Sequence, residues 1–374
     1  MAQPLPAVRA DHIGSLLRPD ALVKARDDFE AGRIDRNGLA EAENAAIADV
    51  VRMQEDVGLK FVTDGEFRRF VYSDSFTSEA LDGVEIELSE EGGWSKSDQH
   101  GHRTARRIPK VTGPVRWKGD KNARDFAELN AATNAIGKVT LPGPAYIHYR
   151  AGRVNISDKV YPNIDRFWAD MVAAYHRELA SLAAAGCTFV QLDETSLVKL
   201  GDERARQLLA DRGDNWEDLL QTYIRVVNEV VAGKPDGMTI GVHICRSQDP
   251  SWQANVGYDP IADAVFNRMN VPVFYLEYEG KRAGAFDPLR FVPKDKTVVL
   301  GLVATYDPEL ESMDFLRSRI NDAAKFIDVS QLGLSPQCGF ATLLGQERVV
   351  SEDVQRAKLA RIVEVANKVW PDGA

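Results

Sequence analysis

Short apolar runs alternate with longer amphipathic stretches from one end of the chain to the other. The runs are rich in Val, Ile, Leu and Phe and show little polar alternation, which is typical of strands buried on both faces. The longer stretches repeat apolar residues at helical spacing, as Phe167, Met171, Tyr175 and Leu179 do. Strands that alternate with helices in this way predict βαβ units around one parallel sheet.

Seven strands and three long helices follow from this pattern. The predicted strands are Phe61–Thr63, Gly137–Leu141, Phe189–Leu192, Met238–Cys245, Val273–Glu277, Thr297–Leu302 and Leu332–Ser335. The predicted long helices are Asp165–Ala185, Asn215–Ala232 and Glu352–Trp370.

The fold class that best fits is α/β, a TIM (β/α)8 barrel, because a barrel accommodates this length as a single domain. We therefore expect one domain over residues 1–374. Residues 83–124 break the rhythm, since they are rich in Glu, Gly, Ser, Lys and Arg without a clean period. They predict an inserted excursion, a hairpin being one form of it.

Composition narrows the functional classes. Of 374 residues 27% are charged and 44% hydrophobic, with no run long enough to cross a bilayer and no apolar leader, so we expect a cytoplasmic protein without a membrane partner. Three cysteines give no disulfide framework, which fits a reducing compartment. A formal charge of −10 argues against a nucleic-acid partner, because phosphate backbones need a basic surface. The pattern leaves the oligomeric state undetermined.

Residues capable of chemistry follow the predicted strands. Asp64-Gly65-Glu66 follows the first, Asp193-Glu194 the third, His243 and Cys245 close the fourth, and Glu277 ends the fifth. In an α/β barrel the carboxyl ends of the strands meet at one mouth. Residues far apart in sequence are therefore expected to share one site.

His243 and Cys245 are the most informative pair. Side chains at i and i+2 of a strand point to the same face, so the imidazole and the thiol would lie side by side. Nitrogen and sulfur are the ligands that zinc prefers. A lone His-x-Cys is also compatible with two buried core residues, because free cysteine is commonly buried. Cys187, at a helix-to-strand junction, is interpreted as core.

Several phrases in the same order resemble the cobalamin-independent methionine synthase family, in particular short proteins similar to its C-terminal catalytic barrel. The phrases span nearly the whole chain: Ile13-Gly14-Ser15, Asp64-Gly65-Glu66, Gly143-Pro144, Gln191-Leu192-Asp193-Glu194, His243-Ile244-Cys245, Glu277 and Pro336-Gln337-Cys338-Gly339.

The resemblance implies a catalytic zinc ion (Zn2+) and homocysteine as the methyl acceptor, with methionine as the product. The implied metal ligands are His243, Cys245, Glu277 and Cys338. The implied substrate-binding residues are Ile13 and Ser15 for the carboxylate of homocysteine and Glu66 and Asp193 for its ammonium group. From the residues alone, Glu279 shares a strand face with Glu277, and Asp64 and Glu194 are alternatives to Glu66 and Asp193.

Two departures concern the methyl donor. The family's folate enzymes carry a tryptophan after Gly143-Pro144, and here the stretch Ala145–Arg150 has none. They also carry a histidine, described as a proton donor, where a rough alignment places Tyr306. Tyr306 is the candidate general acid, although a phenol with a pKa near about 10 donates slowly at neutral pH. Methyl-folate and a methyl-corrinoid donor protein remain the two alternatives.

Three other functions compete. One is a zinc-dependent thiol alkyltransferase resembling the epoxyalkane:coenzyme M transferases, in which Arg18, Arg68, Arg69 or Arg246 would attract a sulfonate. Another is a metal-free barrel resembling uroporphyrinogen decarboxylase, and the last is a scaffold without activity. The carboxylates Glu66 and Asp193 favour an ammonium group over a sulfonate. Metal analysis of the purified protein distinguishes the metal-free barrel from the two zinc enzymes.

Overall fold

The computed structural model describes residues 6–89, 96–97, 103–104, 106–246, 254–342 and 349–371. Its main sheet has seven parallel strands in the order β1-β6-β7-β8-β9-β10-β11. The strands are β1 (Phe61–Val62), β6 (Ile136–Pro142), β7 (Phe189–Glu194), β8 (Thr239–Ile244), β9 (Val273–Glu277), β10 (Thr297–Val303) and β11 (Leu332–Pro336). Each lies within two residues of its predicted position.

The amino-terminal segment lies between the two ends of this sheet. Ala10 forms a parallel bridge with Leu334 of β11, and the Asp11 amide donates to the Leu334 carbonyl at 3.1 Å. A few residues later the Leu16 amide donates to the carbonyl of Gly65, just after β1, at 3.1 Å. The sheet is thus curled, and the arrangement is consistent with the predicted (β/α)8 barrel.

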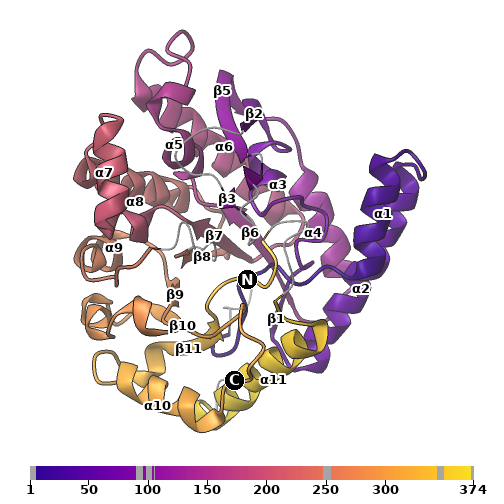
Figure 1. Ribbon diagram of the computed structural model, residues 1–374, viewed down its shortest axis with the longest axis vertical. Helices are drawn as coiled ribbons and strands as arrows, with labels where there is room; N and C mark the ends of the chain where they lie inside the picture. Colours follow the sequence, from indigo (N-terminus) through magenta and orange to yellow (C-terminus); the bar gives the residue numbers. More distant parts are fainter. Residues whose placement is uncertain are drawn as a thin grey trace.

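Helices surround the curled sheet on its outer side (Figure 1). They are α1 (Asp20–Glu30), α2 (Arg36–Asp56), α3 (Asp74–Thr77), α4 (Lys121–Ala131), α5 (Tyr146–Ala151), α6 (Ile164–Ala184), α7 (Glu203–Asp211), α8 (Trp216–Ala232), α9 (Ala262–Arg268), α10 (Met313–Ala323) and α11 (Glu352–Val369).

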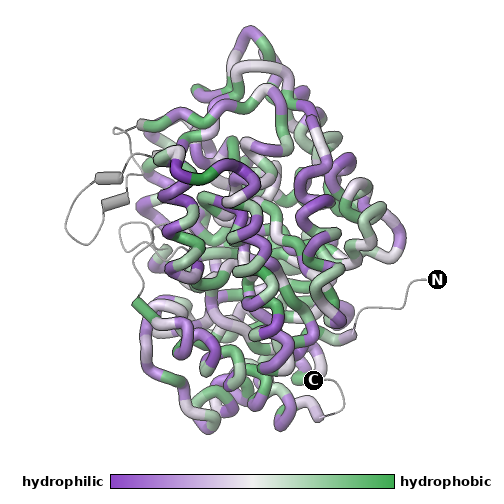
Figure 2. The backbone as a smooth tube through the Cα atoms, turned by 90° about the vertical axis from the view of Figure 1, so that its right-hand side faces the viewer, coloured by the Kyte–Doolittle hydropathy of each residue, from purple (hydrophilic) through white to green (hydrophobic). Residues whose placement is uncertain are grey.

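The three predicted long helices correspond to α6, α8 and α11. Asn163, Asn215 and Ser351 cap their first turns by accepting hydrogen bonds from backbone amides, which fixes where each helix begins. Hydrophilic and hydrophobic positions alternate along the helices, as expected of amphipathic helices that cover a core (Figure 2). Among the described residues, no helix has the length and apolar character to span a bilayer.

Residues 81–117 contain an antiparallel pair outside the main sheet, β2 (Leu81–Ser89) and β5 (Arg106–Trp117). A shorter pair, β3 (Lys96–Ser97) and β4 (Arg103–Thr104), lies between them in sequence. Trp117 donates from its indole to Glu178 of α6 at 2.6 Å, which anchors β5 to a helix that covers the main sheet.

The inside of the curled sheet holds a small apolar cluster and, beside it, a buried polar one. The apolar cluster is Val8, Ile13, Phe61, Phe189, Val273, Tyr275 and Val299. The polar one, here called the interior polar cluster, is Asp11, Lys138, Gln191 and Tyr275, all fully or almost fully buried. Its hydrogen bonds connect β6, β7 and β9 to the amino-terminal segment.

Candidate metal centre

Four side chains converge at the carboxyl ends of three strands. His243 is the penultimate residue of β8, Cys245 directly follows that strand, Glu277 ends β9, and Cys338 lies two residues beyond β11. One ligand atom of each lies within 4.8 Å of the others, and the two sulfur atoms are 3.8 Å apart. The parallel register, in which His243 lies opposite Tyr275 and Ile244 opposite Leu276, brings Cys245 beside Glu277. The structure includes Glu277 rather than Glu279 in this group.

Several ligand atoms of the group have no hydrogen-bond partner. Both ring nitrogens of the buried His243 and Oε2 of the buried Glu277 are in this state, while Glu277 Oε1 accepts from the Arg246 amide at 2.6 Å. Buried polar atoms nearly always have partners, so unpartnered atoms that converge call for an explanation. One imidazole, two thiols and one carboxylate are a donor set that zinc accepts in tetrahedral sites. The residues present therefore fit a zinc ion.

The contact between the two thiols shifts their pKa values in opposite directions. The hydrogen bond with Cys338 lowers the pKa of Cys245, and the same contact with a thiolate raises the pKa of Cys338. Burial alone would lower the pKa of His243, but the Cys245 thiolate and nearby carboxylates outweigh it and raise that pKa to about 9. Burial, followed by the Cys245 charge, raises the pKa of Glu277 to about 8. Without a metal the group thus retains protons that a cation would displace.

Asp193 lies next to this group, and Glu66 is close enough to Asp193 to affect its charge. Asp193 pairs in register with His243 across β7 and β8, and its Oδ1 accepts from Gln191 at 2.7 Å. Glu66 Oε1 accepts from the Thr140 hydroxyl at 2.6 Å, while its buried Oε2 has no partner. Glu66 has a φ of 62°, a strained conformation for a residue with a side chain. Both carboxylates accept hydrogen bonds from side chains, Glu66 from Thr140 and Asp193 from Gln191.

Burial and neighbouring charges shift the pKa values of Glu66 and Asp193. Burial raises the pKa of Asp193 to about 7, with His243 acting in the opposite direction and ionised Glu66 adding to the rise. Burial also raises the pKa of Glu66, against the effect of Arg69, whose guanidinium is 3.4 Å away. Two buried carboxylates that resist ionisation together would be stabilised by a cationic ligand.

The segment Ile13-Gly14-Ser15 is adjacent to both parts of the site. A Cβ on Gly14 would lie 3.3 Å from Glu66 Oε1, and a Cβ on Gly339 would lie 1.9 Å from Ser15 Oγ. The Phe340 amide also donates to the Ser15 carbonyl at 2.9 Å. Ser15 is therefore next to the turn that carries Cys338.

Asp64 and Glu194, the two alternatives, have local roles. Asp64 Oδ1 accepts from the Glu66 amide at 2.9 Å, which supports the turn after β1. Glu194 Oε1 accepts from the Ser196 amide at 2.9 Å, although its buried Oε2 has no partner. The histidine pair His100 and His102, in a stretch crowded with Lys and Arg that lacks the other ligands a metal site needs, lies outside the described residues.

Tyr306 belongs to a chain of contacts that leads to Glu277. Its hydroxyl donates to Glu279 Oε1, and Glu279 is 3.5 Å from the guanidinium of Arg282. Arg282 is in turn 3.9 Å from Glu277 Oε2. Burial and the hydrogen bond to Glu279 both raise the pKa of Tyr306. Arg282 was absent from the sequence-based candidates, and no local pattern singles it out.

Gln191 and Lys138 are further site residues to which the sequence analysis assigned no role. Gln191 contacts both Asp193 and the Ile13 carbonyl, and Lys138 contacts Gln191. Gln191 could have been found, because it is two residues before Asp193 and so shares its face of the strand. Lys138 carried no such signal, since a lysine in an apolar run is usually exposed.

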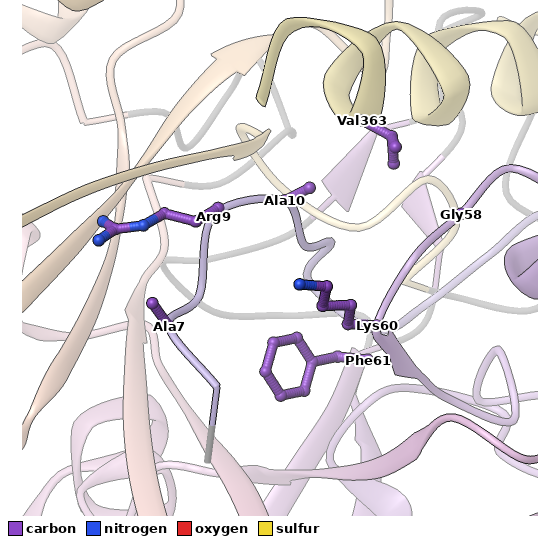
Figure 3. A pocket seen from close by; sticks show the side chains of 7 residues that line it. All are labelled: Ala7, Arg9, Ala10, Gly58, Lys60, Phe61 and Val363. Atoms are coloured by element: carbon purple, nitrogen blue, oxygen red, sulfur yellow. The ribbon is translucent and has the colours of Figure 1, made fainter. Parts of the chain in front are cut away.

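A cavity of about 10 Å³ lies at the other side of the sheet, near the beginning of β1. Figure 3 shows its seven lining residues: Ala7, Arg9, Ala10, Gly58, Lys60, Phe61 and Val363. This volume is about that needed by a single water molecule. It cannot hold an amino acid, and the chemistry-bearing residues are at the opposite, carboxyl edge.

Comparison with known proteins assigns the chain to a family. Residues 9–368 match the family described as "Cobalamin-independent synthase, Catalytic domain". The uncharacterized protein YxjH of Bacillus subtilis (strain 168) is 38% identical over 366 residues, which cover 97% of this chain and 94% of that protein.

Two solved structures are similar over almost their whole length. The putative vitamin-B12 independent methionine synthase from Listeria monocytogenes has 33% sequence identity, covers 98% of this chain and 99% of its own, and gives a TM-score of 0.76. A B12-independent methionine synthase from Shewanella sp. W3-18-1 in complex with selenomethionine has 20% identity, with 98% of each chain covered and a TM-score of 0.73. At that identity the second likeness shows the fold alone.

Proposed function

The chain belongs to the cobalamin-independent synthase catalytic-domain family, and from this premise we propose that it is a zinc-dependent methyltransferase that methylates the thiol of homocysteine to give methionine. The observation that carries the proposal is the convergence of His243, Cys245, Glu277 and Cys338, whose ligand atoms lie within 4.8 Å of one another. We propose these four as the zinc ligands, within a single barrel domain located in the cytoplasm.

The chemistry of the ligands fits this role. Zinc, when bound, keeps a coordinated thiol deprotonated at neutral pH, where a free thiol with a pKa near about 8.5 is mostly protonated. Glu277 would be the ligand best suited to give up its place to a substrate thiol, because carboxylate is the harder donor beside two sulfurs. Its Oε1 already accepts from the Arg246 amide, and Arg282 lies 3.9 Å from its Oε2. A withdrawing carboxylate would thus find a backbone donor and a cation nearby.

Glu66 and Asp193 would bind the ammonium group of homocysteine. Glu66 Oε2 is buried without a partner, so an ammonium donor would satisfy it. Ser15, with Ile13 before it, would hold the carboxylate end beside the Cys338 turn. The substrate sulfur would then point toward the four ligands, because Asp193 is in register with His243.

The coenzyme M alternative has less support. The four arginines that the sequence offered to a sulfonate, Arg18, Arg68, Arg69 and Arg246, each make hydrogen bonds or ion pairs within the protein, although Nε and Nη1 of the buried Arg246 have no hydrogen-bond partner. Arg18 donates to three backbone carbonyls at 3.0 Å, Arg246 donates to two, Arg69 to Thr140, and Arg68 pairs with acidic side chains. The unpartnered oxygen of Glu66 favours a cation over an anion at this position.

The proposal also concerns the identity of the methyl donor. Tyr306 remains our candidate proton donor, and its hydroxyl is bonded to Glu279 with a raised pKa. Folate N5 leaves only when protonated, and a phenol in this state supplies a proton reluctantly. This favours a donor whose leaving group needs no proton, such as a methyl-corrinoid protein, over methyl-folate.

A parallel assay tests the function. Zinc-loaded protein would be incubated with homocysteine and either methyl-folate or methylcobalamin, and with coenzyme M and an epoxide, and products would be identified by mass spectrometry. We expect methionine from at least one methyl donor and no alkylated coenzyme M. Alkylated coenzyme M without methionine would reject homocysteine as the acceptor, and a purified protein free of metal would support the metal-free barrel instead.

A further inference from the structure

Lys138 begins a chain of hydrogen bonds that runs through Gln191 to Asp193 in the proposed substrate site. Its ammonium group donates to Asp11 Oδ2 at 2.9 Å, to the His12 carbonyl, and to Gln191 Oε1 at 3.2 Å. A lysine ammonium has three N–H donors and no acceptor, so all three are used here. Tyr275 donates to the same oxygen of Asp11 at 2.5 Å. The lysine is therefore fixed in place with its charge paired.

This arrangement decides which way the Gln191 amide is turned. Because Lys138 can only donate, the amide oxygen of Gln191 must face it, and the NH2 group must face the other way. Both N–H groups then find acceptors: the Ile13 carbonyl at 2.6 Å and Asp193 Oδ1 at 2.7 Å. With the amide turned over, an oxygen would face two acceptors and an NH2 group would face an ammonium.

We propose that Gln191, held in one amide orientation by Lys138, is a positioning residue that fixes Asp193 for the substrate ammonium group, relative to the Ile13 segment proposed for the carboxylate. The bond from Gln191 occupies Oδ1 of Asp193 and so sets the direction in which Oδ2 is presented to the ligand. The same NH2 group connects Asp193 to the backbone immediately before Gly14 and Ser15. One amide thus sets the relative position of the two segments proposed to bind the amino and carboxylate groups of an α-amino acid.

This inference rests on the proposed function, so its test must separate the two. The ligands are L-methionine and 4-(methylsulfanyl)butanoate, which differs from methionine by lacking the ammonium group. Their dissociation constants would be measured by calorimetry on the wild type, on Gln191→Met and on Gln331→Met, with zinc content determined for each. Gln331 is a matched control, because its buried amide also donates to two oxygens, the carbonyls of Pro293 and Lys296.

We expect Gln191→Met to weaken methionine binding by roughly 10- to 100-fold, the range for a lost hydrogen bond to a charged group. Binding of the deamino analogue should be unchanged, and Gln331→Met should bind both ligands like the wild type. Equal losses for the two ligands, or a full preference for methionine in Gln191→Met, would overturn the positioning role alone. A wild type with no preference for methionine would overturn the proposed substrate and the inference together.

The role of Lys138 is tested by non-additivity. The paired change Lys138→Met with Asp11→Asn removes both buried charges together, and the Tyr275 hydroxyl can turn to accept from the new amide. We expect this pair to reduce the preference for methionine, and adding Gln191→Met to it to cause little further loss. Circular dichroism would confirm the fold of each variant. Fully additive losses would show that Lys138 does not orient Gln191.

Discussion

The protein holds two groups of largely buried polar side chains that differ in how their atoms are satisfied by hydrogen bonds. In the interior polar cluster Lys138 makes three donor contacts and Gln191 uses both its oxygen and its NH2 group. In the candidate metal centre the ring nitrogens of His243 and one oxygen of Glu277 have no hydrogen-bond partner. Both groups are largely buried, with Cys245 half-buried, so burial alone does not indicate function. The unpartnered atoms at the strand ends are what point to a ligand.

The largest expected effect comes from removing a proposed ligand. Cys338→Ser should reduce bound zinc from about one per chain to almost none, since changes even to residues behind a ligand lower metal affinity by roughly 10- to 100-fold. Methyl transfer should disappear with the metal, while circular dichroism stays like that of the wild type. Atomic absorption on purified protein measures the metal content.

Cys187→Ala is the matched control for that variant. Cys187 is buried two residues before β7 begins. Its thiol donates to the Phe189 carbonyl at 3.4 Å, and it is not one of the four proposed ligands. Zinc content and turnover should be unchanged. Normal zinc in Cys338→Ser, or zinc lost in Cys187→Ala, would contradict the assignment of ligands.

Substitutions in the interior polar cluster should change the stability of the protein and leave its metal content unchanged. Lys138→Met leaves Asp11 buried without its cation, which costs roughly 3–5 kcal/mol in the free energy of unfolding. Adding Asp11→Asn should recover most of this loss, because no buried charge is then unpaired. Urea denaturation compares the three proteins. If the single variant were as stable as the double, the ion pair would not have the structural role assigned to it.

Asp193→Asn should affect substrate binding and leave the metal in place. An amide keeps the size of the side chain but removes the charge that attracts an ammonium group. We expect KM for homocysteine to rise roughly 10- to 100-fold, from the loss of a charge-assisted hydrogen bond. Zinc content should remain that of the wild type. A lower kcat with an unchanged KM would place Asp193 in the chemical step instead.

The smallest effect is a change in the pH dependence of stability. The Asp193 pKa is about 7 in the folded protein and about 3.9 when unfolded, so the folded state binds more protons between these values. Its free energy of unfolding should therefore fall as pH rises from about 4 to about 7. Asp193→Asn lacks this contribution, on the order of 1 kcal/mol because the titration is spread over coupled groups.

Urea titrations of metal-free protein at pH 5 and pH 7.5 would measure it. The stability of Asp193→Asn relative to the wild type should be higher at the higher pH. A difference that stayed constant or reversed would show that the buried carboxylate does not resist ionisation.

The sequence predicted the strands well because a strand buried on both faces is a continuous apolar run, as in Val273–Glu277, where prediction and structure coincide. It did not predict that the segment around Ala10 joins β11, since a single bridge leaves no periodic pattern. His243 and Cys245 were found from the two-residue strand period. Glu277 was preferred to Glu279 through the family resemblance, whereas the physical reason, the register between β8 and β9, is not encoded by any single strand.

Buried charge was the least predictable property. Lys138 lies in an apolar run, and its partner Asp11 is 127 positions away, so neither signals the other along the chain. The orientation of Gln191 follows from that contact and was equally inaccessible. Local sequence patterns thus located the residues at the strand ends. The contacts that orient those residues form only when distant segments of the chain come together in the folded protein.

The most direct test of the central claim is X-ray absorption at the zinc edge of the purified protein, before and after addition of homocysteine. The account predicts about one zinc per chain with two sulfur ligands and lighter nitrogen or oxygen ligands, and a third sulfur once the thiol is added. A protein without zinc, or a zinc whose sulfur count stays the same in the presence of homocysteine, would contradict it.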